Sequence, residues 1–559
     1  MNEFLEKLST LWPEMVMLCG AVACLAAGLW SSAAIRKATP WVAAGSMVLA
    51  WLLTVASANS EAGRAVAALH PLGVGQMVPY VKCLILAMGL ILLMVNAGVP
   101  ERLKQSLLAE DAPGQPGRFE PGSSVRGEFY AFFLLSITGV MLTAGATDLV
   151  WLFLALELTS LPTYVMIATS RDRAMAQESA IKYFFLGALS AAVFLYGFAM
   201  IYGATGFTEF RQIATTIAEM QTSSGGDLVS APGGLMLILG LMLSVLGLCY
   251  KIAAVPMHLY AADVYEGAAT PVTAFLAVVP KTAGFAALIL LMGLLAWDLP
   301  DPLATLLVVL AVLTMTIGNV LAIIQNNLKR TLAYSSIAHS GYLLTGLVAG
   351  VSLTASTSTG EPSAIGSGVA AVLFYLLAYA MGTVGSFAVL ACVRQQVGDD
   401  ATPGVEPDEV TYRELAGLWW KSPVLAGVML VSMLSLVGMP PLAGFLGKVY
   451  LIGGLFTAGY PVLVIAIVIN SAISAGYYLR IAMTCFFGQP TPGVGYARPP
   501  WLVAASVITT LAAFTLGGYA AHGIVRNSHE AITPGKPVAS AAAEPAPATA
   551  DLHPAPAHH

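Results

Sequence analysis

The chain has 559 residues, of which 57% are hydrophobic and only 10% are charged. Soluble domains carry about 25% charged residues, so this composition excludes an ordinary soluble protein and predicts an integral membrane protein. The net charge of −5 is small for this length and gives no sign of a nucleic-acid partner.

Fourteen apolar runs are long enough to cross a bilayer, which takes about 20 helical residues. They lie near residues 13–35, 40–58, 78–98, 127–146, 148–169, 178–203, 232–260, 271–297, 302–325, 329–350, 366–393, 422–458, 462–486 and 501–523. The first run follows acidic and polar residues, which is not typical of a cleaved signal peptide. The pattern predicts an all-α polytopic membrane protein.

Proline interrupts the seventh and twelfth runs. Pro256 lies near the end of the seventh, and Gly438-Met439-Pro440-Pro441 divides the twelfth. Because proline removes a backbone donor and clashes with the preceding turn, we expect both helices to be broken. The interruptions are five helices apart, which predicts two inverted five-helix repeats, helices 4–8 and 9–13.

These elements divide the chain into five segments: a three-helix segment with its loop (1–126), the first repeat (127–297), the second repeat (298–486), a C-terminal helix (487–525) and a tail (526–559). The tail is rich in Ala and Pro, a composition that predicts disorder. The polar connections 99–126, 204–231 and 394–420 are predicted to be loops.

Basic residues are unevenly divided between alternate connections. One side holds fifteen: Arg36, Lys37, Arg102, Lys104, Arg118, Arg126, Arg171, Arg173, Lys329, Arg330, Arg394, Arg413, Lys421, Arg480 and Arg498. The other side, with both termini, holds five: Lys7, Arg64, Arg211, Arg526 and Lys536. Since cytoplasmic connections collect Lys and Arg, both termini are predicted to lie outside the cytoplasm.

The sequence lacks the motifs of a redox enzyme. It has no GxGxxG after a strand, no Walker motif, and no cysteine or histidine cluster at the spacing of metal ligands. Its six cysteines are scattered through apolar runs, as small hydrophobic residues are. The chain is therefore predicted to hold no nucleotide, flavin, metal or iron-sulfur cluster.

Five charged residues lie inside apolar runs: Glu157, Lys182, Lys251, Lys281 and Lys448. Each costs on the order of 2.5–3.5 kcal/mol at a helix centre, so such residues are functional candidates that line an interior path. Glu157 lies about 14 Å along its helix, near mid-bilayer. Lys281 has no sequence neighbour that can pair with it, and a buried lysine without a counter-ion releases its proton more easily.

Three further polar residues join this hypothesis of a proton path. His258 follows Lys251 by seven residues, two turns along one helical face, although a lone histidine is as readily structural. His339 and Tyr342 are three apart and are placed to carry protons between the lysines. Snorkelling to the membrane surface explains Lys82 and remains an alternative for Lys182.

At these residues the sequence resembles a known family. The strings LALELTSLPTYV, HLYAADVYEGAATPVTAFLAVVPKTAGFAAL, NNLKRTLAYSSIAHSGYLL and GMPPLAGFLGKVYL are similar to the antiporter-like membrane subunits of bacterial proton-pumping NADH-quinone oxidoreductase, respiratory complex I. The similarity covers roughly residues 10–525. A lysine on the twelfth helix fits subunits N and L of that family, and the chain lacks the long amphipathic helix of subunit L, so it most resembles subunit N.

This resemblance implies a function. Glu157, Lys182, Lys251, Lys281 and Lys448 match the charged positions that carry protons in the family. It also implies a location in the bacterial inner membrane with both termini periplasmic, and partners among the other antiporter-like and small helical subunits of complex I. NADH, FMN, iron-sulfur clusters and quinone are then expected in those partners.

Two alternative functions and the partner of one charged residue stay open at this point. The chain could instead be a large subunit of a multi-subunit Na⁺/H⁺ antiporter, whose core is similar, or a membrane scaffold without transport. A relay of lysines favours H⁺, because an ammonium group cannot ligate Na⁺ as a carboxylate does. Whether Glu157 pairs with Lys251 or Lys182 cannot be read from the sequence.

Overall fold

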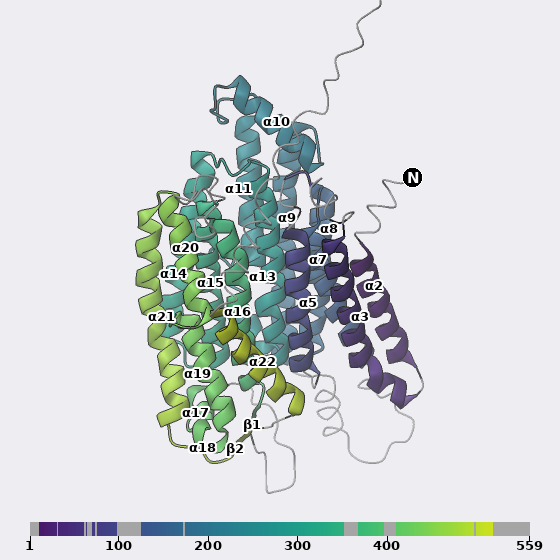
Figure 1. The fold of residues 1–559 in the computed structure, drawn as a ribbon, viewed down its shortest axis with the longest axis vertical. Helices are drawn as coiled ribbons and strands as arrows, with labels where there is room; N and C mark the ends of the chain where they lie inside the picture. Colours follow the sequence, from purple (N-terminus) through teal and green to yellow (C-terminus); the bar gives the residue numbers. More distant parts are fainter. Residues whose placement is uncertain are drawn as a thin grey trace, which may run out of the picture.

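The computed structural model describes residues 11–30, 32–60, 63, 70–72, 75, 77–97, 125–170, 174–350, 367–395, 410–496 and 499–517. Long helices run side by side, close to the long axis of the molecule (Figure 1). The N-terminal helices lie along one flank and those of the second predicted repeat along the other. The predicted disordered tail, 526–559, and most of the predicted loop 99–126 lie outside the described residues.

The N-terminal segment contains α2 (Trp12–Leu29), α3 (Ala33–Asn59) and α5 (Met77–Asn96). The next seven helices are α7 (Val125–Ala144), α8 (Leu149–Ala168), α9 (Ala174–Thr205), α10 (Phe210–Ser223), α11 (Gly234–Lys251), α12 (Ala261–Gly267) and α13 (Thr270–Gly293). The remaining elements are α14 (Asp301–Ile323), α15 (Leu328–Ala349), α16 (Gly368–Leu390), β1 (Val393–Gln395), α17 (Tyr412–Leu415), α18 (Leu418–Lys421), α19 (Pro423–Val437), α20 (Ala443–Thr457), α21 (Pro461–Phe487), β2 (Val494–Tyr496) and α22 (Pro500–Gly517).

The predicted membrane spans all correspond to helices. Eleven helices in the described part of the chain are long and apolar enough to cross a membrane. The other predicted spans match α15, the broken pair α19 and α20, and α22. The prediction of an all-α polytopic membrane fold is therefore confirmed, with one small addition: β1 and β2 pair antiparallel beside α17 and α18 (Figure 1).

Both predicted helix breaks are present. The seventh span stops at Lys251, the last residue of α11, and helical structure resumes at Ala261. The twelfth span stops at Val437, and α20 begins at Ala443. Breaks of this kind free backbone carbonyl groups inside the bilayer, and these must find donors within the protein.

Matching features in the two halves support our proposal of repeats. Asp148 caps the N-terminus of α8 through its carboxylate, and Asn327 caps α15 through its amide oxygen. Asp148 also forms an isolated bridge to Glu209, and Asn327 forms one to Thr411. The fifth and tenth spans, which the repeats would equate, thus begin in the same way.

Burial separates a central group of helices from a peripheral one. In α13 and α16 the most apolar window is 100% and 94% buried, whereas in α3 it is only 22% buried. Lys281 and His339 lie on α13 and α15, where nearly every residue is shielded by other helices. Lys281 and His339 therefore lie on central helices that are surrounded by other helices.

Some predicted loops contain secondary structure. The prediction of a loop over 204–231 is wrong, because α10 occupies its middle. Phe210, Ile213 and Ile217 are buried at helical spacing while most other positions of α10 are polar, so this helix is amphipathic and has no continuous apolar run. The connection 394–420 likewise contains α17 and α18 in its described part.

Candidate functional site

Glu157 and Lys251 form an ion pair between α8 and α11. Lys251 Nζ lies 3.1 Å from Glu157 Oε1, and it also donates to the Ser160 hydroxyl. The Lys251 side chain is 1% exposed and that of Glu157 is 19% exposed. The pairing left open by the sequence is therefore with Lys251, at the point where α11 ends.

Lys182 lies elsewhere. Its ammonium group pairs with Glu178 at 2.8 Å and with Asp263 of α12 at 3.0 Å, and its side chain is 43% exposed. Arg330 binds the other oxygen of Asp263 at 2.9 Å. The alternative pairing between Lys182 and Glu157 is thus wrong, because the Lys182 side chain reaches Glu178 on its own helix and Asp263 of α12 instead.

His258 does not share a helical face with Lys251. That prediction is wrong because α11 ends at Lys251, and His258 lies in the non-helical segment before α12. The imidazole is buried, and its Nδ1 has no hydrogen-bond partner among the described residues.

Lys281 is held by neutral groups. Its Nζ donates to the backbone carbonyl of Ser336 at 2.6 Å and to the Ser336 hydroxyl at 2.7 Å. The ammonium group also lies 4.4 Å from the centre of the Tyr379 ring, and the Tyr379 hydroxyl donates to the Ser336 hydroxyl oxygen. The hydrogen bonds of Lys281 in the described part of the chain thus go to a carbonyl and a hydroxyl.

His339 and Tyr342 do share a face of α15, with ring centroids 5.6 Å apart. The two ring nitrogens of His339 lie 2.8 Å from the Tyr375 hydroxyl and 2.9 Å from the Tyr478 hydroxyl. Asn319 donates to the Tyr342 hydroxyl at 3.1 Å. The histidine therefore lies in a polar cluster built from four helices, α14, α15, α16 and α21.

Lys448 contacts the backbone at the second helix break. Its Nζ donates to the carbonyl of Val437, the last residue of α19, at 2.8 Å. It also lies 4.8 Å from the centre of the Tyr342 ring. The carbonyl that the break removes from the helical ladder is thus satisfied by the lysine that follows the break.

Comparison with known proteins identifies the family. The family model for NADH:quinone oxidoreductase and Mrp antiporter membrane subunits matches residues 146–474. NADH-quinone oxidoreductase subunit N of Trichlorobacter lovleyi is 40% identical over 406 residues, which cover 73% of this chain and 77% of that protein. The chain belongs to the NADH-quinone oxidoreductase subunit N family. A subunit N from Sorangium cellulosum is also 40% identical, over 70% of this chain and 74% of its own length.

Solved structures agree with this family. A chain of respiratory complex I from Thermus thermophilus, solved with bound aureothin, is 31% identical, with a TM-score of 0.65 over 90% of this chain and 96% of that one. A chain of the Mrp complex from Dietzia is only 20% identical, with a TM-score of 0.71 over 94% of this chain and 98% of that one, and shows the fold alone.

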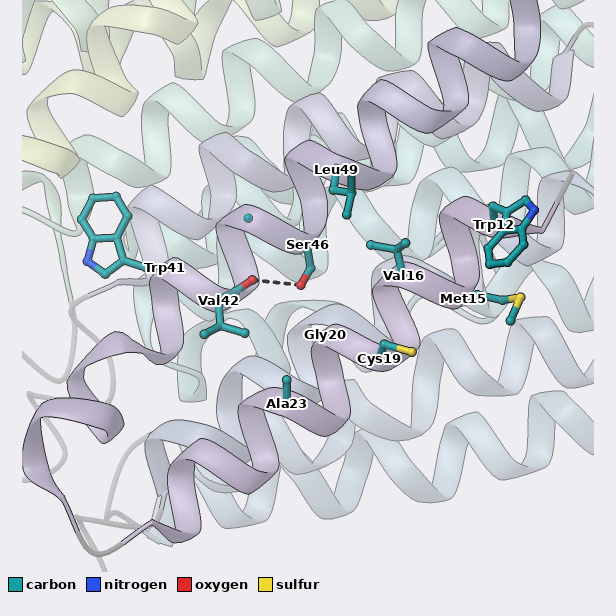
Figure 2. A pocket seen from close by; sticks show the side chains of 11 residues that line it. Trp12, Met15, Val16, Cys19, Gly20, Ala23, Trp41, Val42, Ser46 and Leu49 are labelled. Carbon is teal, nitrogen blue, oxygen red and sulfur yellow. Dashed lines mark hydrogen bonds between the residues drawn. The ribbon is translucent and has the colours of Figure 1, made fainter. Parts of the chain in front are cut away.

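The family match includes every candidate residue from Glu157 to Lys448 and leaves out the N-terminal helices. A groove between α2 and α3 lies in that outer part, with Trp12 near one end and Trp41 near the other (Figure 2). None of the candidate residues lines it. It is therefore separate from the site.

Several polar residues around the buried lysine and histidine of this subunit N family member were not predicted from the sequence. Ser336, Tyr375, Tyr379 and Tyr478 contact the buried lysine or histidine, yet each lies in an apolar run that reads as core. Only the four-residue spacing of Tyr375 and Tyr379 hinted at a shared polar face.

The explanation of Lys82 by snorkelling is wrong. Its side chain is 7% exposed and pairs with Glu14 of α2 at 2.6 Å. The lysine points into the protein because a buried carboxylate lies there, and no glutamate this far away in sequence could be assigned to it beforehand.

Proposed function

We propose that this chain is a proton-translocating membrane subunit of an NADH-quinone oxidoreductase and that it carries no redox centre itself. Its similarity to NADH-quinone oxidoreductase subunit N proteins supports membership of that complex. Its buried charged residues support a role in proton transport. NADH, FMN, iron-sulfur clusters and quinone would then be bound by partner subunits. Quinone reduction there would change the charge balance along this chain.

One observation carries the proposal: the buried basic residues form a series across the central helices. Lys251 is paired with Glu157, Lys281 is held by Ser336, and Lys448 is held at the second break. His339 and Tyr342 lie between the last two lysines. Ionisable side chains inside a membrane are costly, and where they occur in series they usually mark a path for ions or protons.

The ion pair supplies the control. A carboxylate 3.1 Å from Lys251 stabilises the protonated lysine. If a charge change in a neighbouring subunit draws Glu157 away, Lys251 gives up its proton more readily, and Lys281 loses a repelling charge. Lys281 then accepts a proton and passes it by way of His339 to Lys448.

The energies involved are of the right size. Moving one charge across a potential of 100 mV costs about 2.3 kcal/mol. A tenfold change in the proton affinity of one group is worth about 1.4 kcal/mol. Changes in pairing at one or two buried lysines therefore suffice to drive one proton against the membrane potential.

The family and the apolar helices support a multi-pass location in the bacterial inner membrane. We further propose that both termini face the periplasm, since the basic connections then face the cytoplasm. Partners would be other membrane subunits of the complex, including antiporter-like and small helical subunits, together with the lipid bilayer.

The test is Lys281→Ala in the assembled complex, measured in membrane vesicles as NADH-driven proton pumping and NADH-to-quinone electron transfer. The expected result is assembly with a loss of pumping of at least about tenfold, because the group that holds the proton is gone. Lys37→Ala is the control, since Lys37 is exposed at the start of α3. Normal pumping by Lys281→Ala would overturn the path.

The alternative of a Na⁺/H⁺ antiporter subunit is not favoured, because the Mrp chain is only 20% identical whereas subunit N relatives reach 40%. Purification tests the choice between the two. A complex that contains this chain together with flavin and iron-sulfur clusters supports the oxidoreductase. A complex without either, and with Na⁺-dependent proton exchange in vesicles, would contradict it.

A further inference from the structure

His339 has a tyrosine hydroxyl on each of its ring nitrogens. Nδ1 lies 2.8 Å from the Tyr375 hydroxyl of α16, and Nε2 lies 2.9 Å from the Tyr478 hydroxyl of α21. The three side chains are at most 2% exposed. A tyrosine hydroxyl both donates and accepts a proton, so each ring nitrogen has a neighbour that can serve either role.

The Tyr478 side of the histidine leads toward Lys281. The Tyr478 hydroxyl also bonds the Ser335 hydroxyl. Ser335 is adjacent in the chain to Ser336, which accepts the hydrogen bond from Lys281. A second contact on this side comes from Tyr379, whose ring lies 5.1 Å from the imidazole and whose hydroxyl donates to Ser336.

The Tyr375 side leads toward Lys448. The Tyr375 ring packs directly against Gly447, the residue before Lys448, so closely that no Cβ would fit there. The Tyr478 hydroxyl is thus bonded to the residue before the one that holds Lys281, and the Tyr375 ring contacts the residue before Lys448.

The chain of hydroxyls has two complete arrangements. A neutral imidazole carries a proton on one nitrogen and accepts at the other. If Nδ1 carries the proton, it donates to Tyr375, and Tyr478 donates to Nε2. If Nε2 carries it, every donor and acceptor in the series is reversed. Both arrangements keep the two hydrogen bonds of the imidazole, so neither leaves a ring nitrogen unpaired.

We propose that Tyr375 and Tyr478 are relay residues that let His339 pass a proton from one ring nitrogen to the other without rotating. This inference rests on the proposed function. Tyr478 gives its proton to Nε2 and takes one from the Ser335 hydroxyl, which a water molecule on the Lys281 side reprotonates. The Nδ1 proton moves to Tyr375, whose own proton passes to a water molecule on the Lys448 side. Only O–H and N–H bonds form and break, and the net change is one proton moved.

Rotation of the ring is the route that the packing opposes. It would break both hydrogen bonds at once, and the rings of Tyr342 and Tyr379 lie 5.6 Å and 5.1 Å from the imidazole. Exchange between the two arrangements by proton transfer needs no side chain to change rotamer.

The test uses Tyr375→Phe and Tyr478→Phe, which keep the buried rings and remove only the hydroxyls. The control is Tyr130→Phe, another buried tyrosine, whose hydroxyl bonds the Ala97 carbonyl in the N-terminal part. Proton pumping by the assembled complex is expected to fall at least about tenfold in the first two variants and to stay normal in the control. The kinetic effect of replacing H₂O by D₂O should change in the same two variants.

Normal pumping and an unchanged D₂O effect in both variants would overturn the relay. If Lys281→Ala still abolishes pumping in that case, the relay fails while the proposed function stands. If Lys281→Ala is also normal, the function fails.

Should a phenylalanine variant fail to assemble, 3-fluorotyrosine at position 478 decides. It keeps the hydroxyl and changes its acidity, so the pH profile of pumping is expected to shift. A profile identical to that of the unmodified complex would contradict the relay.

Discussion

Lys251, Lys281 and Lys448 are buried to a similar degree, with 3%, 2% and 6% exposure, yet their partners differ. Lys251 pairs with a carboxylate, whereas Lys281 and Lys448 each have a backbone carbonyl and an aromatic ring, with the Ser336 hydroxyl added at Lys281. Among the described residues, Lys251 is the one of the three with a carboxylate partner. A charge on either of the other two costs desolvation that dipoles and an aromatic ring offset only in part, which suits groups that must gain and lose a proton.

This difference gives a prediction for Lys281→Arg. Arginine keeps the positive charge and the donors but does not lose its proton in proteins. The complex is expected to assemble, while proton pumping falls at least about tenfold, as with alanine. The control is Lys421→Arg, because Lys421 donates to the Thr491 and Val494 carbonyls, which lie outside the path. Full pumping by Lys281→Arg would show that proton release from this position is not required.

A second prediction compares Lys182→Ala with Lys251→Ala. The ion pairs of Lys182 are partly exposed, and such pairs contribute about 0–1 kcal/mol. Removing Lys251 leaves Glu157 without its partner in the membrane, at a cost of about 3–5 kcal/mol. Lys182→Ala should therefore retain most of the pumping that Lys251→Ala loses. Equal losses in vesicle assays would return Lys182 to the path.

At the scale of the helix, glycines decide which helices approach closely. Gly197 of α9 lies against Gly240 of α11, and a Cβ at Gly197 would lie 2.6 Å from the Gly240 carbonyl oxygen. Gly318 of α14 lies against Ala338 of α15, where a Cβ would lie 2.6 Å from the Ala338 amide nitrogen. Small residues at such crossings let membrane helices pack backbone to backbone. This packing fixes α11, and with it Lys251, relative to α9.

The corresponding prediction is that Gly197→Ala destabilises the protein by about 1–3 kcal/mol, since the added methyl group overpacks the crossing. Gly45→Ala is the matched control, because a Cβ there meets no atom within 4 Å. It should be neutral or stabilising by up to about 1 kcal/mol, the gain in helix propensity. Thermal unfolding of the purified complexes measures both, and equal melting temperatures would contradict the close approach.

At the scale of the whole molecule, the two helix breaks lie in opposite halves and each has a lysine beside it. Lys251 ends α11 before the first break, and Lys448 reaches back to the last carbonyl before the second. The central helices connect them, since α13 contacts α11 and also α15 and α16, and these two contact α20. A path through the two halves would join two half-channels that open on opposite sides of the membrane.

The orientation gives a prediction at this scale. Alkaline phosphatase fused after residue 525 is expected to be active, because the C-terminus would be periplasmic, where the enzyme folds. Fused within the connection 394–420 it should be inactive, since that connection carries basic residues of the cytoplasmic side. The reverse pattern of activities would invert the topology.

The spans and the two breaks were predictable from the sequence because both depend on local properties. A membrane helix needs a run of apolar residues of fixed length, and a proline within it interrupts the backbone hydrogen bonds. The amphipathic α10 was missed for the same reason, since its apolar residues recur every three or four positions and form no continuous run.

The sequence by itself determined which charged residues lie in the membrane, since their cost there makes them stand out in an apolar run. Only the tertiary structure decided their partners. Glu157 pairs with Lys251 and not with Lys182, and Lys82 pairs with Glu14. The hydroxyls of Tyr375 and Tyr478 lie within hydrogen-bond distance of His339. These contacts join residues up to 139 positions apart. They depend on how helices pack, and helix packing is set by the shapes of whole faces and not by any local pattern.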